Sequence, residues 1–97
     1  MMLQSAQPLM IHRRPVGEEL DLHQLTVDEA LLKLDEYLHN AFLAGMIQVR
    51  VVHGKGTGTL REAVRDFLAR HPLVRSSRPG AYGEGGTGVT VAYLADK

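Results

Sequence analysis

The stretch MIQVRVVHGKGTGTLREAVRDFLARH, residues 46–71, decides the fold of this chain. Residues 46–53 form a short β-branched run that lies between glycines, a pattern that favours a strand over a helix. HGKGTG, residues 53–58, follows as a glycine-rich loop. A helix is then predicted from Thr59, with Glu62 completing a capping box, to His71, before Pro72. Its buried face consists of Leu60, Ala63, Val64, Phe67 and Leu68.

Residues 18–45 predict another strand followed by a helix. In EELDLHQ, residues 18–24, alternation places the two leucines on one face and Asp21 with His23 on the other. Thr26 and Glu29 form a capping box, and Gly45 ends the helix in a left-handed conformation. The apolar stripe of this helix consists of Val27, Ala30, Leu31, Leu34, Leu38, Ala41 and Phe42.

The remaining chain predicts a strand over 74–78, a loop over 78–86 and a final strand over 88–94. The order is therefore β-α-β-α-β-β. Right-handed crossovers place both helices on the same side of the sheet. The expected fold is an α/β two-layer sandwich, with two helices on one face of a four-stranded mixed sheet. His23 and His53 then lie at the carboxyl edge, where such sheets bind ligands.

The length of 97 residues predicts a single domain over 18–97. Apolar residues in 1–17 recur neither at the period of a strand nor at that of a helix, so a flexible N-terminal arm is predicted there. Without cysteine the chain has no disulfide, no Cys-ligated zinc and no thiolate nucleophile. It has no long apolar run and no secretory signal pattern, so we expect a cytoplasmic protein without a membrane partner.

The formal net charge is zero, but the charges are unevenly distributed. Residues 18–36 carry seven acidic side chains against one lysine, whereas residues 50–80 carry seven basic side chains against two acidic ones. An anionic partner would be drawn to the basic half. The alternative is that two oppositely charged helix surfaces attract each other.

The HGKGTG loop has the chemistry of a phosphate site. Exposed amides and a helix amino terminus favour an anion, and repeated glycines allow close approach. The alternative is a simple tight turn. The loop matches neither a Walker A motif nor a dinucleotide fingerprint. We therefore expect it to bind one phosphate of a polymer backbone through Gly54, Lys55, Gly56, Thr57, Gly58 and Arg61.

His23 and His53 are candidates for proton transfer, because each ends a predicted strand beside this loop. Asp21 would orient His23 or raise its pKa through its charge. These three residues are also the candidates for a divalent metal site, a less favoured reading. The remaining histidines have structural or solvated interpretations: His12, His39 and His71.

Three motifs in this order carry a family resemblance: LDLHQ at 20–24, HGKGTG at 53–58 and GGTGVT at 85–90. The chain resembles the Smr (small MutS-related) domain over residues 18–94. The text around the second motif is especially similar to the carboxyl-terminal module of bacterial MutS paralogues that suppress recombination. The resemblance implies a fold similar to the carboxyl-terminal domain of a bacterial translation initiation factor, consistent with the sandwich derived above.

The resemblance also implies endonuclease activity, on DNA in some members and on messenger RNA at stalled ribosomes in others. Asp21 and His23 occupy the Asp-x-His positions that the RNA-cutting branch ties to cleavage. The sequence departs from the family at Gln24, where glycine is usual, and at His23, where many DNA-type members carry arginine. The implied partners are DNA or RNA, with a MutS-type ATPase domain in the same chain or the ribosome.

Phosphodiester hydrolysis is the predicted activity, with His23 and His53 sharing the base and acid roles and the loop holding the phosphate. Gly85 and Gly86 are expected to support the substrate loop. The alternative is a non-catalytic module that binds structured nucleic acid. Self-association through an open edge of the last strand is a third possibility. Tyr82 is the aromatic residue expected in an exposed loop, so unpaired-base recognition has limited support from the sequence.

Overall fold

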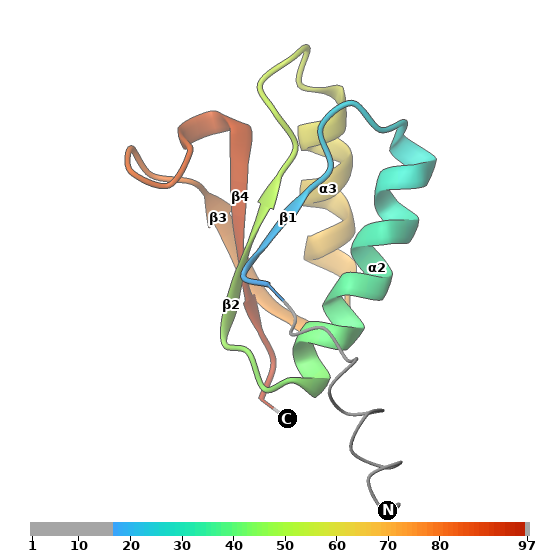
Figure 1. The fold of residues 1–97 in the computed structure, drawn as a ribbon, viewed down its shortest axis with the longest axis vertical. Helices are drawn as coiled ribbons and strands as arrows, with labels where there is room; N and C mark the ends of the chain where they lie inside the picture. Colours follow the sequence, from blue (N-terminus) through green and yellow to red (C-terminus); the bar gives the residue numbers. More distant parts are fainter. Residues whose placement is uncertain (1–16, 97) are drawn as a thin grey trace, which may run out of the picture.

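The computed structural model describes residues 17–96, so the predicted arm lies outside the described residues except for Gly17. Figure 1 shows the elements that it contains. They are β1 (Glu19–Asp21), α2 (Val27–Leu43), β2 (Gln48–Val52), α3 (Thr59–Arg70), β3 (Val74–Pro79) and β4 (Val89–Leu94), with a 3₁₀ turn at Gly86–Gly88 before β4.

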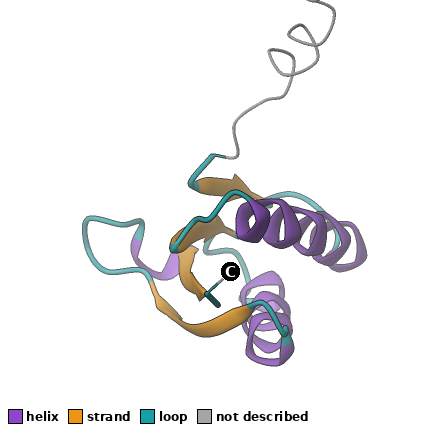
Figure 2. Cartoon of the chain, turned by 90° about the horizontal axis from the view of Figure 1, so that it is seen from below, coloured by secondary structure: helices purple, strands orange, loops and turns teal. Residues whose placement is uncertain are grey.

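The strands form one mixed sheet in the order β1-β2-β4-β3. β1 pairs in parallel with β2, aligning Asp21 with Val52, while β4 pairs antiparallel with both β2 and β3. Both helices cover the same face of the sheet, as the end-on view in Figure 2 shows. The predicted α/β two-layer sandwich is therefore confirmed.

Helix α2 has the start and end that the sequence predicts. The Thr26 hydroxyl accepts a hydrogen bond from the Glu29 amide at 3.2 Å, and the Glu29 carboxylate accepts one from the Thr26 amide at 3.1 Å. At the other end, Gly45 has a φ of +77°, and the amide of Met46 donates to the Ala41 carbonyl at 3.1 Å. This is the Schellman arrangement, which requires a left-handed residue at that point.

The predicted capping box at the start of α3 is wrong. Gly58 is the N-cap, with a φ of +90°, and it offers no side chain to the helix. Thr59 is already the first helical residue, and its hydroxyl pairs with that of Thr57 at 3.0 Å instead. The Thr59 amide donates to the Thr57 hydroxyl at a long 3.4 Å, and the N-cap residue gives the following amides no side-chain acceptor.

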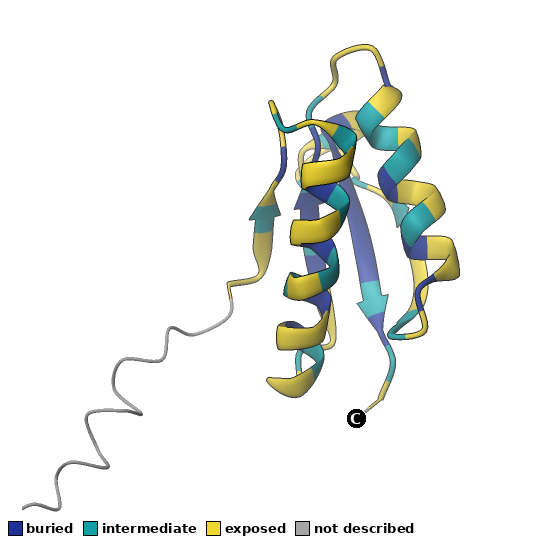
Figure 3. Ribbon diagram, turned by 90° about the vertical axis from the view of Figure 1, so that its right-hand side faces the viewer, coloured by how far each residue is buried: buried dark blue, intermediate teal, exposed yellow. Residues whose placement is uncertain are grey.

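The core lies between the two helices and the sheet face that they cover, as the dark blue segments in Figure 3 show. Its buried members come from the segment after β1, from one face of each helix, and from alternate residues of β2 and β4. They are Leu22, Ala30, Leu34, Leu38, Ala41, Val49, Val51, Val64, Leu68, Ala92 and Leu94. None of the described helices is both long and apolar enough to cross a membrane.

Candidate functional site

Three loops lie in the upper part of the molecule in Figure 1: those that join β1 to α2, β2 to α3, and β3 to β4, the last of which turns outward to the left. The carbonyl of Gly88 accepts hydrogen bonds from the amides of His53 and Gly54, both at 3.0 Å. A Cβ atom on Gly88 would lie 3.4 Å from Cγ of Lys55. The third sequence motif therefore supports the glycine loop from below, and Gly88 is the residue that makes this contact.

Asp21 and His23 form a hydrogen-bonded pair at this end of the sheet. Nδ1 of His23 lies 2.5 Å from Oδ1 of Asp21, and the same oxygen accepts the His23 amide at 3.0 Å. The hydrogen bond from the His23 ring is the main reason why the pKa of Asp21 lies below its usual range. About half of the His23 side chain is exposed (50 %). With Nδ1–H donated to the carboxylate, Nε2 is the nitrogen left to exchange protons.

His53 has a different environment, since it is only 5 % exposed. Its Nδ1 lies 3.0 Å from the Gly54 carbonyl, and its Nε2 lies 2.9 Å from the hydroxyl of Thr90. A carbonyl only accepts, so Nδ1 carries the proton and Nε2 accepts from Thr90. Burial lowers the pKa of His53, which favours this neutral form.

The structure therefore brings His23 and His53 to neighbouring strand ends but gives their rings no common partner. His23 pairs with Asp21 near the surface, whereas both ring nitrogens of His53 are engaged inside. A shared acid and base role for the two rings stays a prediction, and this geometry favours a positioning role for His53.

Thr90 was expected only to pack within its strand, and its bond to His53 is a role that the sequence analysis did not assign. It is 2 % exposed and lies opposite Val51 in the β2–β4 ladder. The sequence contains a signal for this role. Because side chains alternate along a strand, Thr90 lies on the same face of β4 as the buried Ala92 and Leu94. A hydroxyl on the core-facing side of a strand needs a partner, and His53 provides one.

The glycine loop itself is open at its tip. Gly54, Gly56 and Gly58 all have positive φ, and a Cβ atom on Gly56 would meet nothing within 4 Å. Gly54 packs on the first motif, since a Cβ there would lie 3.4 Å from Cβ of His23. Lys55, Gly56 and Thr57 are exposed. The loop is thus adjacent to the Asp21–His23 pair and presents its backbone outward.

A groove of about 330 Å³ runs between this loop and the β1–α2 connection. Arg61 lines it, and the guanidinium covers Gly58, where a Cβ atom would lie 2.8 Å from Nη2. Lys55 also lines the groove, together with Gln24, Leu25 and Thr26. The groove therefore combines two cations with the amino terminus of α3, whose N-cap Gly58 has no side chain, and this is a favourable environment for an anion.

Gln24 forms part of the same groove and has a φ of +75°. Among residues 17–96 it is the one non-glycine residue with a positive φ. A left-handed conformation favours glycine, which explains physically why glycine is the usual residue here in the resembling family.

Gly85 and Gly86 bind within their own loop. Gly85 packs against the side chain of Val89 so closely that a Cβ atom would collide with it. The Gly86 amide donates to the Ala81 carbonyl at 3.1 Å. Neither glycine bonds to the glycine loop directly. The Gly85 carbonyl accepts the Gly88 amide at 3.2 Å, and the Gly88 carbonyl in turn accepts the amides of His53 and Gly54.

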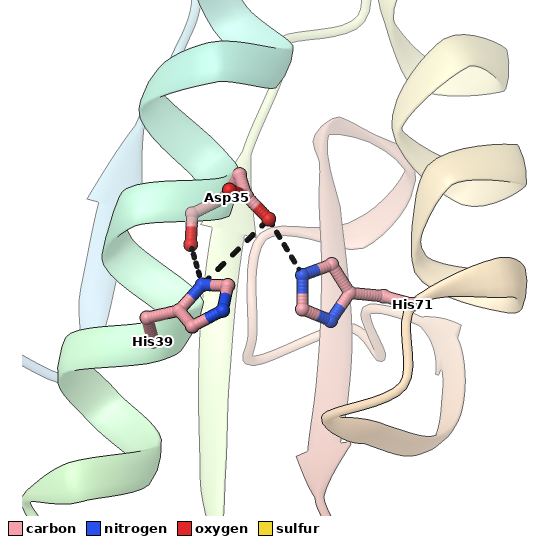
Figure 4. A group of neighbouring side chains, drawn as sticks. All are labelled: Asp35, His39 and His71. Atoms are coloured by element: carbon pink, nitrogen blue, oxygen red, sulfur yellow. Dashed lines mark hydrogen bonds and ion pairs between the residues drawn. The ribbon is translucent and has the colours of Figure 1, made fainter.

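Within residues 17–96, the side chains grouped closely enough to hold a metal are Asp35, His39 and His71, rather than the predicted Asp21, His23 and His53. Figure 4 shows this group between α2 and the end of α3. Nε2 of His71 lies 2.8 Å from Asp35 Oδ1, and Nδ1 of His71 accepts the Leu73 amide at 3.1 Å. The lone pair of the His71 ring is therefore used by the backbone, so the group is better described as a structural link.

The fold and the site together define a small α/β domain with an Asp–His pair and a glycine loop at the carboxyl edge of its parallel strands. The family model described as "Smr domain" matches residues 20–95, so this chain belongs to the Smr domain family.

Similar proteins agree with this assignment. The chain is 47 % identical over 92 residues to "Endonuclease MutS2" of Caldicellulosiruptor bescii, covering 95 % of this chain and 12 % of that protein. It is 53 % identical over 79 residues to "Endonuclease MutS2" of Clostridium beijerinckii, covering 81 % of this chain and 10 % of the relative. The chain thus spans about a tenth of the length of these relatives.

Solved structures show the same fold. The Smr domain of Thermus thermophilus MutS2 superposes with a TM-score of 0.79 at 48 % identity, covering 81 % of this chain and 99 % of that chain. YdaL, a stand-alone small MutS-related protein from Escherichia coli, gives a TM-score of 0.76 at 21 % identity, over 99 % of this chain and 78 % of that chain. The second likeness concerns the fold alone.

Proposed function

We propose that this Smr domain is an endonuclease domain that hydrolyses phosphodiester bonds of DNA or RNA. The observation that carries the proposal is the Asp21–His23 pair, which lies beside the glycine loop with Nε2 of His23 turned away from the carboxylate. The name "endonuclease" of the MutS2 relatives supports it. In those relatives the domain is a small part of a longer chain, and we propose a MutS-type ATPase as its partner in the same chain.

In the proposed reaction, the scissile phosphate lies against the amides of the glycine loop and the ammonium of Lys55. These groups counter the negative charge that develops on the phosphate oxygens. His23 Nε2 accepts a proton from the attacking water molecule as the water oxygen bonds to phosphorus. The bond from phosphorus to the leaving sugar oxygen breaks, and that oxygen takes a proton from solvent.

Asp21 and His53 act as positioning residues in this scheme. Asp21 holds the His23 ring in the tautomer with an unprotonated Nε2 and stabilises the imidazolium that forms. His53 hydrogen-bonds to the Gly54 carbonyl and the Thr90 hydroxyl, and so fixes the start of the glycine loop relative to β4. Arg61 is assigned to a neighbouring phosphate.

The test compares wild type with His23→Ala and Asp21→Asn on supercoiled plasmid and on labelled RNA, each with and without a chelator. We expect His23→Ala to lower the cleavage rate about 10² to 10⁴-fold, as removal of a proton-transfer group does. His39→Ala is the matched control, because His39 is another exposed histidine whose Nδ1 is held by a local oxygen, the Asp35 carbonyl at 2.9 Å.

Equal cleavage by wild type and His23→Ala would contradict the assignment of the site. The double variant Asp21→Asn, His23→Ala should cleave at the rate of His23→Ala alone, because Asp21 acts through the ring. The second candidate function is a non-catalytic nucleic-acid-binding module. The observation that favours it is that His53 is buried with both ring nitrogens bonded to the protein, and so has none left for proton transfer. That module is supported if neither protein cleaves while both bind with strong salt dependence.

A further inference from the structure

Tyr82 is fully exposed (100 %) at the tip of the loop that joins β3 to β4. The other large apolar side chains exposed in residues 17–96 are two leucines of α2 and Ile47 before β2. Tyr82 differs from them in position, because its loop leaves the same edge of the sheet as the glycine loop: Val89, which follows the Tyr82 loop, lies opposite Val52, which precedes the glycine loop. From that edge the β3–β4 loop turns outward (Figure 1).

The loop around Tyr82 is an ordered turn. The Glu84 amide donates to the Ala81 carbonyl at 2.8 Å, which places Tyr82 at the second position of a four-residue turn. The Glu84 carboxylate closes the turn by accepting the Ala81 amide at 2.8 Å. It also accepts hydrogen bonds from both terminal nitrogens of Arg78, at 2.7 and 2.9 Å. The Tyr82 ring is therefore held outward by a bonded frame.

The base of this loop is tied to the sheet and to the glycine loop. Nε of Arg78 donates to the Tyr93 hydroxyl at 2.9 Å, and its guanidinium carbon lies 5.7 Å from the centre of the Tyr93 ring. At the other end of the loop, Gly88 accepts the amides of His53 and Gly54. Both ends of the loop that carries Tyr82 are thus anchored, one to the sheet and the other to the glycine loop.

We propose that Tyr82 stacks on an unpaired base of the nucleic acid whose backbone lies on the glycine loop. This inference rests on the proposed function and names its substrate class, a nucleic acid with an unpaired nucleotide on the β3–β4 side of the bound phosphate. The cations Lys55 and Arg61 bring the polyanion to this end of the molecule. An isolated, exposed aromatic ring suits any nucleobase, because every base has a π face.

The base must be unpaired, because both faces of a base within a duplex are already covered by its neighbours. Stacking on one aromatic side chain contributes about 5- to 150-fold in affinity. Glu84 is ionised at neutral pH, since hydrogen bonds from Arg78 lower its pKa to about 2. The frame that presents Tyr82 therefore stays closed under the conditions in which nucleic acid is bound.

The test measures binding of a labelled single strand and of a blunt duplex of the same length, in a His23→Ala background that prevents cleavage. Tyr82→Ala should weaken binding of the single strand about 5- to 150-fold and leave binding of the duplex unchanged. Tyr82→Phe is the matched control and should bind as the parent does, because it keeps the ring. No loss with Tyr82→Ala, or an equal loss on both probes, would overturn the inference.

A second readout uses the absence of tryptophan from this chain. In Tyr82→Trp the indole is the sole tryptophan, and stacking should quench its fluorescence when the single strand is added but not when the duplex is added. Lys55→Ala distinguishes the two proposals. If wild type binds neither probe and Lys55→Ala changes nothing, the proposed function fails. If binding depends on Lys55 but not on Tyr82, only this inference fails.

Discussion

At the scale of single residues, His53 and Thr90 determine how the glycine loop is attached to the sheet. The ring of His53 connects the hydroxyl of Thr90 in β4 to the carbonyl of Gly54. Both side chains are buried, so neither has water as an alternative partner. The contact therefore converts a loop of flexible residues into one with a defined position.

Thr90→Val should lower the free energy of unfolding by about 1 to 3 kcal/mol, because it leaves Nε2 of His53 buried without a donor. Thr90→Ser keeps the hydroxyl and should cost about 0.8 kcal/mol for the lost methyl group. Urea unfolding measures both values. The nitrogen NMR shift of His53 Nε2 should change in the valine variant and not in the serine variant. Equal costs with no difference in this shift would contradict the proposed bond.

The buried state of His53 also predicts a dependence on pH. Its pKa in the folded protein lies below the ordinary value of 6.5, mainly because burial disfavours the charged ring. The neutral ring therefore contributes stability that is fully present above about pH 6.5 and is lost as pH falls through the lower folded pKa. Proton NMR of the ring should give a midpoint below 6.5 in the native protein. A midpoint at or above that value would refute this account.

At the scale of elements, the Asp35–His71 hydrogen bond links the middle of α2 to the end of α3. Its two residues are 36 apart in the sequence, and the His71 ring also packs beside Phe67 at a centroid distance of 5.3 Å. Nδ1 of His71 accepts the Leu73 amide, which turns the chain toward β3. One buried side chain thus holds both helices and the following connection.

Asp35→Ala should destabilise the domain by about 1 to 3 kcal/mol, because Nε2–H of the buried His71 loses its acceptor. Glu36→Ala is the matched control, an exposed carboxylate on the same helix, and should change stability by less than about 0.5 kcal/mol. Hydrogen exchange should accelerate at the Leu73 amide in the first variant alone. Equal effects of the two substitutions would show that charge on α2, rather than this bond, matters.

At the scale of the whole molecule, a net charge of zero conceals separate acidic and basic regions. The basic side chains near the glycine loop, Lys55 and Arg61, line one groove with exposed backbone amides. Arg75 lies at the other end of the sheet, beside Phe42, Gly45 and Leu94. We therefore expect phosphate contacts to be concentrated at one end of the molecule.

The salt dependence of nucleic-acid binding tests this expectation. Arg61→Ala should lower the slope of log affinity against log salt concentration by about 1, because one phosphate contact is lost. Arg75→Ala removes the same charge from the opposite end and should leave the slope unchanged. Fluorescence anisotropy over a salt series measures both. An equal change in the two variants would indicate binding through overall charge.

The sequence predicted the elements well wherever near neighbours decide them. Alternation separated Leu22 from Asp21 and His23, and the capping box of α2 starts at Thr26 as expected. The same reasoning failed at Thr59, because Gly58 with its positive φ takes the N-cap position and moves Thr59 into the helix. A Thr-x-x-Glu pattern cannot by itself distinguish the cap from the first helical residue.

The amino-acid sequence by itself determined the order of strands and helices, the two-layer architecture and the nearness of Asp21 to His23, since these depend on spacing over a few residues. Only the tertiary structure decided that β4 lies between β2 and β3, and that His53 pairs with Thr90, 37 residues away, rather than facing His23. The physical reason is that strand order and burial follow from packing of the complete core. Contacts distant in sequence are formed only when that core is assembled.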